Sequence, residues 1–171
     1  MINKDYRQDL VSDFMVKGKQ WDGETLLSST PNQQELETYK LRLKLSIEET
    51  FELFEAMLTE RAYKDKFENI LNTINSEIAS ISSEQAEIKP VDIFDSLVDQ
   101  DYVNIGLANL LGLDMKAGFQ EVQHSNLSKF GPEGIPTFRE DGKVLKDPRT
   151  YVEPNLAEVY KKSSYTYTGF N

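Results

Sequence analysis

The stretch LRLKLSIEETFELFEAML, residues 41–58, decides the fold. At 100° per residue it places Leu43, Ile47 and Phe51 on one apolar stripe of a helix. A second stripe lies more than a quarter-turn away around the helix. It begins with apolar residues, continues with two glutamates and ends with a small residue: Leu41, Leu45, Glu48, Glu52 and Ala56. Because a solvated face would be polar throughout, we expect this helix to be buried on two sides and its glutamates to face another element.

Helical periodicity continues to about Phe130 and predicts an all-α fold, a bundle of four to five helices. The expected helices cover about residues 4–17, 30–60, 61–81, 90–112 and 114–130. Thr30 is expected to cap the second helix, with Pro31 as its first residue and Gln33 closing a capping box.

The remaining chain has a different character. Asp141-Gly142 predicts the turn of a small hairpin, residues 151–160 predict a further helical turn, and residues 163–171 predict a loose tail. We therefore expect a single domain over residues 1–171, with a helical core at about 4–131 and the hairpin and tail at about 132–171.

A second acidic helix is expected after Pro90. Asp92, Asp95 and Asp99 follow one another at i, i+3 and i+7, so they share a face. If the two acidic helices pack together, five or more carboxylates converge, and they cannot all stay ionised without compensating charge. Hard divalent cations such as Mg²⁺ or Mn²⁺ would supply it through oxygen ligands.

Composition excludes several classes of function. The chain has 171 residues and no cysteine, which rules out disulfides, thiolate nucleophiles and iron–sulfur clusters. Its net charge of −10 disfavours binding to a nucleic-acid polymer, and no apolar stretch is long enough to span a membrane. We expect a soluble, cytoplasmic protein that reaches any polyphosphate substrate through divalent cations.

At these acidic residues the sequence resembles the MazG-like all-α NTP pyrophosphohydrolases, in particular the phage-associated and dimeric-dUTPase-like branch. EETFE (48–52) is similar to the EExxE half of the signature, and DIFD (92–95) to the ExxD half, with Asp92 in place of the usual Glu. Further similar stretches are DFMVKGKQ (13–20), VQHSNLSKFG (122–131) and EDGKVLKDPRTYVEPNL (140–156). Thirty-nine residues separate Glu52 from Asp92, more than the family usually has, which implies a longer insertion.

The resemblance implies hydrolysis of a nucleoside triphosphate, most typically a deoxynucleotide, to the monophosphate and pyrophosphate, as house-cleaning of the nucleotide pool. It places Mg²⁺ on Glu49, Glu52, Asp92 and Asp95. Glu48 would either join this cage or deprotonate the attacking water. Relatives assemble as dimers or dimers of dimers, so a homodimer or homotetramer is expected.

The resemblance also implies which residues meet the nucleotide. Asp99 is followed three residues later by Tyr102, as in the family, and Asn126 and Lys129 match positions that face the nucleotide. The further candidates for contacts to the base, sugar and phosphates are Gln20, Trp21, Lys146 and Tyr151.

Three other interpretations stay open. A di-iron carboxylate bundle would use Glu121 and His124 as an ExxH pair, but it needs two such pairs and the chain has one histidine. Phosphoribosyl-ATP pyrophosphohydrolase has the same cage, and a helical interaction module could keep it without turnover. Walker A, GxGxxG and serine–histidine motifs are absent from the sequence.

Overall fold

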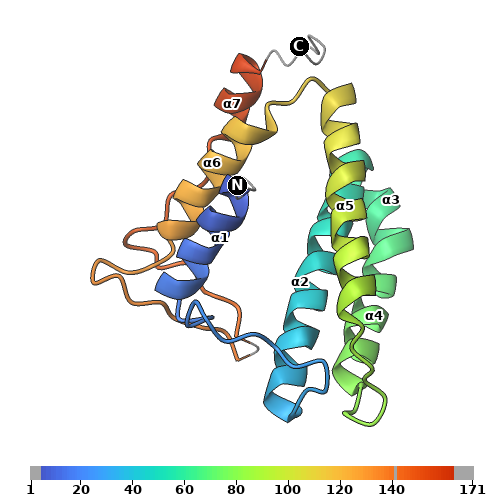
Figure 1. The fold of residues 1–171 in the computed structure, drawn as a ribbon. Helices are drawn as coiled ribbons and strands as arrows, with labels where there is room; N and C mark the ends of the chain where they lie inside the picture. Colours follow the sequence, from blue (N-terminus) through green and yellow to red (C-terminus); the bar gives the residue numbers. More distant parts are fainter. Residues whose placement is uncertain (1–4, 141, 164–171) are drawn as a thin grey trace, which may run out of the picture. The chain divides into compact units, whose positions relative to one another are not determined.

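The computed structural model describes residues 5–140 and 142–163, and its regular elements are helices, which confirms the predicted all-α fold (Figure 1). In chain order they are α1 (Tyr6–Lys17), α2 (Gln33–Met57), α3 (Glu60–Tyr63), the π-helix η1 (Lys64–Glu68), α4 (Asn69–Ser80), α5 (Pro90–Leu110), α6 (Met115–Leu127) and α7 (Leu156–Lys162). The chain forms two compact units, a first one of Met1–Thr25 with Val91–Asn171 and a second one of Leu26–Pro90. The single domain over residues 1–171 stays a prediction.

In the second unit, α2 begins two residues later than predicted. Asn32, not Thr30, is the N-cap: its side chain accepts a hydrogen bond from the Glu35 backbone N–H at 3.0 Å, and the Glu35 carboxylate accepts one from the Asn32 N–H at 2.9 Å. Glu35 also accepts from the Ser28 N–H. The box therefore closes through the Glu35 side chain, three residues after Asn32, and the prediction that Gln33 closes it was wrong.

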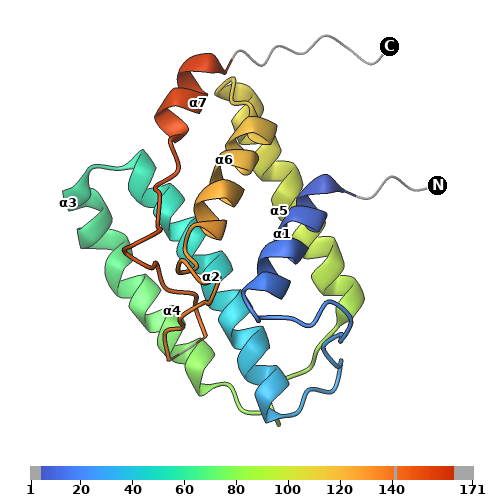
Figure 2. The same cartoon turned by 90° about the vertical axis from the view of Figure 1, so that its left-hand side faces the viewer.

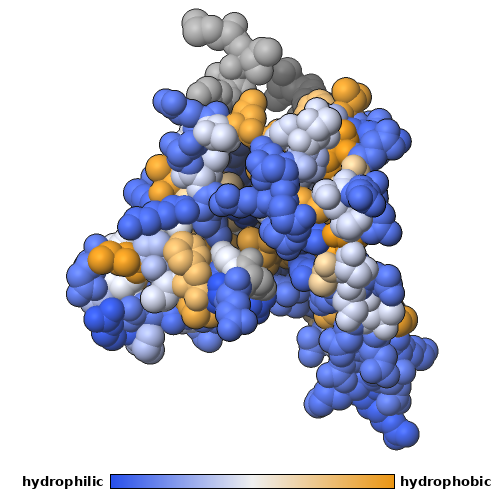
Figure 3. All heavy atoms as spheres, turned by 90° about the horizontal axis from the view of Figure 1, so that it is seen from below, coloured by the Kyte–Doolittle hydropathy of each residue, from blue (hydrophilic) through white to orange (hydrophobic). Residues whose placement is uncertain are grey.

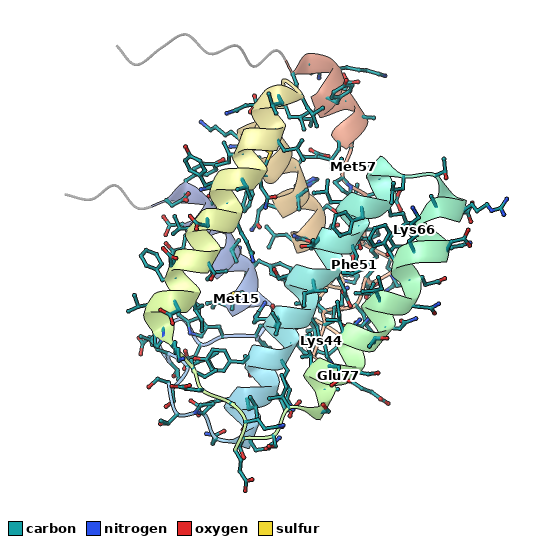
Figure 4. The ribbon with its side chains drawn as sticks, turned by 90° about the vertical axis from the view of Figure 1, so that its right-hand side faces the viewer. Met15, Lys44, Phe51, Met57, Lys66 and Glu77 are labelled. Atoms are coloured by element: carbon teal, nitrogen blue, oxygen red, sulfur yellow. The ribbon has the colours of Figure 1, made fainter. Side chains whose placement is uncertain are left out.

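The continuous helical segment formed by α3, η1 and α4 packs along α2 (Figure 4), and aromatic rings make part of the contact. Phe67, on η1, stacks on Phe54 at 5.1 Å between ring centroids and meets the edge of the buried Phe51 at 6.3 Å. The segment predicted as a single helix over 61–81 is thus a continuous helical segment that contains a π-turn. This π-turn places Phe67 against α2.

A buried lysine joins α2 to the C-terminal end of α4. Lys40 of α2 is 6% exposed, and its ammonium donates to the Ala79 carbonyl, near the C-terminus of α4, at 3.2 Å. It also pairs with Glu37 at 2.9 Å. A cation at a helix C-terminus satisfies carbonyls that have no partner within the helix, so Lys40 fixes where α4 ends against α2.

In the first unit, α1 runs parallel to α6 (Figure 2). Tyr6 meets Phe119 edge to face, the buried Gln123 side chain donates to the Leu10 carbonyl at 2.8 Å, and Phe14 stacks on Phe130 at 5.3 Å. Contacts in the same order along both segments fix their direction, and they bring the C-terminal ends of both helices together.

A strap of residues 147–163, which includes α7, returns antiparallel along α6. Thr150 donates to the Phe130 carbonyl, the Val152 N–H to the Ser128 hydroxyl, and the Asn155 N–H to the Glu121 carboxylate. The predicted helical turn in this region is α7, capped by the Asn155 side chain.

Helix α5 also belongs to the first unit, and Arg7 holds it there. The guanidinium makes two hydrogen bonds, of 2.9 and 2.8 Å, with the Asp101 carboxylate. Most other α5 side chains are exposed, including Val91, Phe94 and Tyr102. Apolar residues also reach the surface on the face drawn in Figure 3, among hydrophilic ones.

The predicted hairpin is small. Phe138 and Val144 form an isolated antiparallel bridge, supported by the Arg139 N–H to the Lys143 carbonyl at 2.8 Å. Gly142 has φ +89°, as a tight turn requires, whereas Asp141 and the tail beyond Ser163 lie outside the described residues. In the part of the chain that is described, no helix is long and apolar enough to cross a membrane.

The end of α1 carries local strain. The helix ends at Lys17 with Gly18 as its C-cap, and the left-handed residue is Lys19, with φ +53°. The Gln20 N–H bonds to the Met15 carbonyl and the Lys19 N–H to the Val16 carbonyl, which is a Schellman motif whose left-handed position normally holds glycine.

We expect Lys19→Gly to raise the free energy of unfolding by about 1 kcal/mol, because glycine adopts this φ without a steric penalty. Urea denaturation followed by circular dichroism measures the change. The matched control Lys17→Gly, within the last turn of α1, should lower stability by a similar amount. A loss of stability in Lys19→Gly would contradict the assigned motif.

Candidate active site

The glutamates of the first motif lie in the middle of α2. Glu48, Glu49 and Glu52 share one uninterrupted helix, so Glu49 and Glu52 are one turn apart. Glu49 and Glu52 are exposed, and Glu48 is half-buried. Burial, and then the charges of Glu55, Glu68 and Glu52 in that order, raises the pKa of Tyr63, so Glu52 is the residue of the motif that acts on this phenol.

The aspartates of the second motif lie in the first three turns of α5. Asp92, Asp95 and Asp99 are all exposed, and the helix is regular across them. Tyr102, one turn further on, is 78% exposed. The predicted helical spacing of the aspartates is therefore confirmed.

The two motifs belong to different compact units of the chain. Across the described ranges, no three acidic or histidine side chains gather tightly enough to hold a metal ion. A cage made from both helices stays a prediction.

Several candidate substrate residues meet at the C-terminal end of α6, within one unit. The Lys146 ammonium lies 4.3 Å from the centre of the Tyr151 ring. Hydrogen bonds from Lys146 and then from Ser125 lower the pKa of Tyr151, because they stabilise the phenolate. Asn126 and Lys129 are half-buried on the same end of the helix, and the Lys129 carbonyl accepts the Asp147 N–H.

Gln20 lies in the loop that leaves α1. Its side-chain amide donates to the Gly142 carbonyl at 3.4 Å, and its Oε1 atom is buried without a hydrogen-bond partner among the described residues. An acceptor buried without a partner is destabilising unless a ligand completes it. The Phe14–Phe130 stack places this loop at the same end of the unit as Lys129.

The side chain of Trp21, the next residue, has no unused hydrogen-bond donor for a ligand. Its indole N–H is already used, since it donates to the Thr25 carbonyl at 2.6 Å. Asp22 holds that turn by accepting from the Glu24 and Thr25 N–H groups. The Thr25 side-chain hydrogen bond and these backbone bonds lower the pKa of Asp22 to about 2. Only the ring of Trp21 is available for contact.

Some positioning residues were not predicted. Ser125 is 4% exposed and bonds to Tyr151, although its sequence context gives no signal beyond the SNLSK stretch. Arg149 pairs with Asp147 at 2.6 Å and lowers its pKa to about 2. Both residues set the position of the strap that carries Tyr151.

Comparison with known proteins identifies a family and a fold. The family described as phosphoribosyl-ATP pyrophosphohydrolase matches residues 23–126. The fold is similar to the crystal structure of a candidate NTP pyrophosphohydrolase from Exiguobacterium sp. 255-15, with a TM-score of 0.56 and 23% identity over 94% of this chain and 97% of that one. No curated protein matches the sequence.

The lowered pKa of Tyr151 gives a spectroscopic test of the α6 cluster. We expect one tyrosine to ionise below the usual pKa of about 10, since hydrogen bonds to its oxygen favour the charged form. Absorbance at 295 nm during a pH titration would show this early phase, and Tyr151→Phe would remove it. Tyr160→Phe, on the exposed surface of α7, should leave it in place. An early phase that survives Tyr151→Phe would contradict the cluster.

Proposed function

Because the chain belongs to the phosphoribosyl-ATP pyrophosphohydrolase family, we propose that it hydrolyses a nucleoside triphosphate to the monophosphate and pyrophosphate. Within that class we propose a deoxynucleoside triphosphate as substrate and house-cleaning of the nucleotide pool as the role. The observation that carries the proposal is the extent of the family match, because residues 23–126 include both acidic motifs.

The acidic side chains fit a hard divalent cation. All five candidate ligands offer carboxylate oxygens, and four of them, Glu49, Glu52, Asp92 and Asp95, are exposed on regular helices. These four would hold Mg²⁺, with Mn²⁺ as a substitute, and the bound ion supplies positive charge that neutralises the phosphates.

Glu48 has a separate role in this proposal. Its carboxylate would accept the proton of the water that attacks the phosphoric anhydride, or it would join the other four ligands. It is half-buried, whereas Glu49 and Glu52 on the same helix are exposed, so it is set apart from the other two glutamates of the motif. The anhydride P–O bond breaks, and pyrophosphate leaves with that oxygen.

The α6 cluster would hold the rest of the nucleotide. Lys129 and Lys146 would bind phosphate oxygens, and Tyr151 would donate a hydrogen bond. The buried Oε1 atom of Gln20 would accept a hydrogen bond from the base. Asn126, Trp21, Asp99 and Tyr102 are the remaining candidates for sugar and base contacts.

Phosphoribosyl-ATP is the second candidate substrate, because it is the substrate named in the family's description. Lys129, Lys146 and Tyr151 lie outside the matched residues, so this cluster is where a different preference would arise. The cytoplasmic location expected from the sequence stays a prediction.

We expect the purified chain with Mg²⁺ to convert one or more nucleotides to the monophosphate and pyrophosphate. The substrates to compare are the common dNTPs and NTPs and phosphoribosyl-ATP, with products separated by ion-exchange chromatography. Glu49→Gln should lower kcat/KM about 100-fold or more, and removal of the metal should abolish turnover.

The matched control is Glu77→Gln, an exposed glutamate of α4 outside both motifs, which should keep full activity. Turnover of phosphoribosyl-ATP alone would replace the dNTP proposal with the second candidate. If the chain binds the metal but hydrolyses none of these substrates, the remaining interpretation is a non-catalytic helical module.

We also propose that the chain assembles as a homodimer or homotetramer. One stripe of α5 exposes four apolar side chains a turn apart, Val91, Phe94, Val98 and Tyr102, which are 77%, 68%, 50% and 78% exposed. Contiguous apolar surface of this kind is typical of an interface.

Analytical ultracentrifugation tests this assembly. We expect a mass above that of one chain, and we expect Phe94→Glu to reduce it, because the charge would have to be desolvated at an apolar contact. Tyr160→Glu on α7 is the control. A wild-type protein that sediments as one chain at micromolar concentration would end the proposal.

A further inference from the structure

Arg42, on α2, is a cation that neither acidic motif accounts for. Its side chain is half-buried, and that burial lowers the pKa of Arg42. Residues three and four positions away on the helix are Thr38, Tyr39, Leu45 and Ser46, none of which carries a charge. The helix therefore gives this guanidinium no ion-pair partner of its own.

Other arginines of the chain are paired with carboxylates. Arg7 binds Asp101 at 2.8 Å, Arg149 binds Asp147 at 2.6 Å and Arg61 lies 3.7 Å from Asp65. For Arg42 the described part of the structure records neither an ion pair nor a hydrogen bond from the side chain. In a chain with 29 acidic residues, a half-buried guanidinium without an anion is unexpected.

The position of Arg42 on α2 relates it to the acidic motif. Glu49 follows it by seven residues, so the two side chains lie about 20° apart around the helix and about 10 Å apart along it. Ser46 lies between them on the same face. Arg42 therefore stands two turns before the first expected metal ligand, on the face that presents Glu49.

The anion that suits this position is the polyphosphate of a substrate. A guanidinium binds phosphate oxygens in a planar, two-pronged geometry, and it is less strongly hydrated than an ammonium, so partial burial costs it less. The two other cations of α2, Lys40 and Lys44, each lie two residues from Arg42 and so point to a different side of the helix. Arg42 is therefore the cation of α2 on the face of Glu49, at a distance that suits the phosphates beyond the reacting phosphorus.

We propose that Arg42 binds the pyrophosphate half of the substrate and holds it as the leaving group. This inference rests on the proposed hydrolysis, whose products include pyrophosphate. It assigns Arg42 to the phosphates that depart, whereas the residues of the two motifs act where the anhydride bond breaks.

The test is a calorimetric titration of the full-length chain with inorganic pyrophosphate in Mg²⁺. We expect Arg42→Gln to weaken pyrophosphate binding about 10- to 100-fold, as loss of a hydrogen-bonded charge pair does. Arg42→Lys should cause a smaller loss, because it keeps the charge but not the two-pronged geometry.

The matched control is Lys44→Gln. Lys44 lies two residues further along α2, about 200° around the helix from Arg42, and its substitution removes the same charge. We expect binding within about twofold of the wild-type protein. Circular dichroism at 222 nm and thermal unfolding check that each variant is folded.

Several results would overturn the inference. One is a wild-type protein that does not bind pyrophosphate. Another is an equal loss of pyrophosphate affinity in Arg42→Gln and Lys44→Gln. A third is unchanged pyrophosphate binding in Arg42→Gln together with a smaller assembly mass, which would mean that Arg42 pairs with a second copy. If Arg42→Gln does not fold, an Arg42→Lys protein with wild-type affinity would overturn it. Arg42-dependent pyrophosphate binding without turnover of any nucleotide would support this assignment and end only the proposed hydrolysis.

Discussion

The capping box at the start of α2 sets the register on which the candidate site depends. Asn32 and Glu35 satisfy each other's backbone N–H groups, and from there 25 residues continue as one helix without a break. Because every residue advances by a fixed 100°, the start of the helix determines which side chains share a face. Glu48, Glu49 and Glu52 are thereby held on successive turns, and Arg42 falls on the face of Glu49.

In the first unit, α6 has the corresponding central position. Helix α1 lies along it in parallel, and the strap returns along it in the opposite direction. Ser128 is important here, because its hydroxyl donates to the Ser125 carbonyl and accepts from the Val152 N–H. One side chain thus ties the end of α6 to the strap, and so places Tyr151 beside Ser125. The polar cluster at this end follows from backbone hydrogen bonds more than from the lysines themselves.

Much of this architecture could be predicted because helical periodicity is local. The acidic spacing on α2 and α5, the Asp114 cap of α6 and the position of α7 follow from residues within a few turns. The N-cap of α2 was wrong, since Thr30-Pro31 and Asn32 offer competing starts and the choice depends on the Glu35 side chain. The bonds of Lys40 to Ala79 and of Gln123 to Leu10 join residues 39 and 113 positions apart. No local pattern encodes such pairs. The metal ligands and nucleotide contacts were proposed from resemblance, and periodicity does not contain how two helices pack, so a cage shared by α2 and α5 stays a prediction.

The π-turn of η1 has a consequence for how this protein tolerates changes in length. A π-turn accommodates one more residue than an α-turn, so the wheel positions before and after Lys64–Glu68 are out of step with each other. Ile78, the buried residue of α4, follows this turn in the chain, so the extra residue is absorbed before the part of α4 that packs on α2 begins. A single-codon deletion within η1 that restores a regular α-helix would remove the residue that the π-turn absorbs, and it would leave the apolar face of α4 in step with α3. A homologous chain that lacks one residue in this segment should therefore keep the same apolar face on α4 without a second change in length nearby.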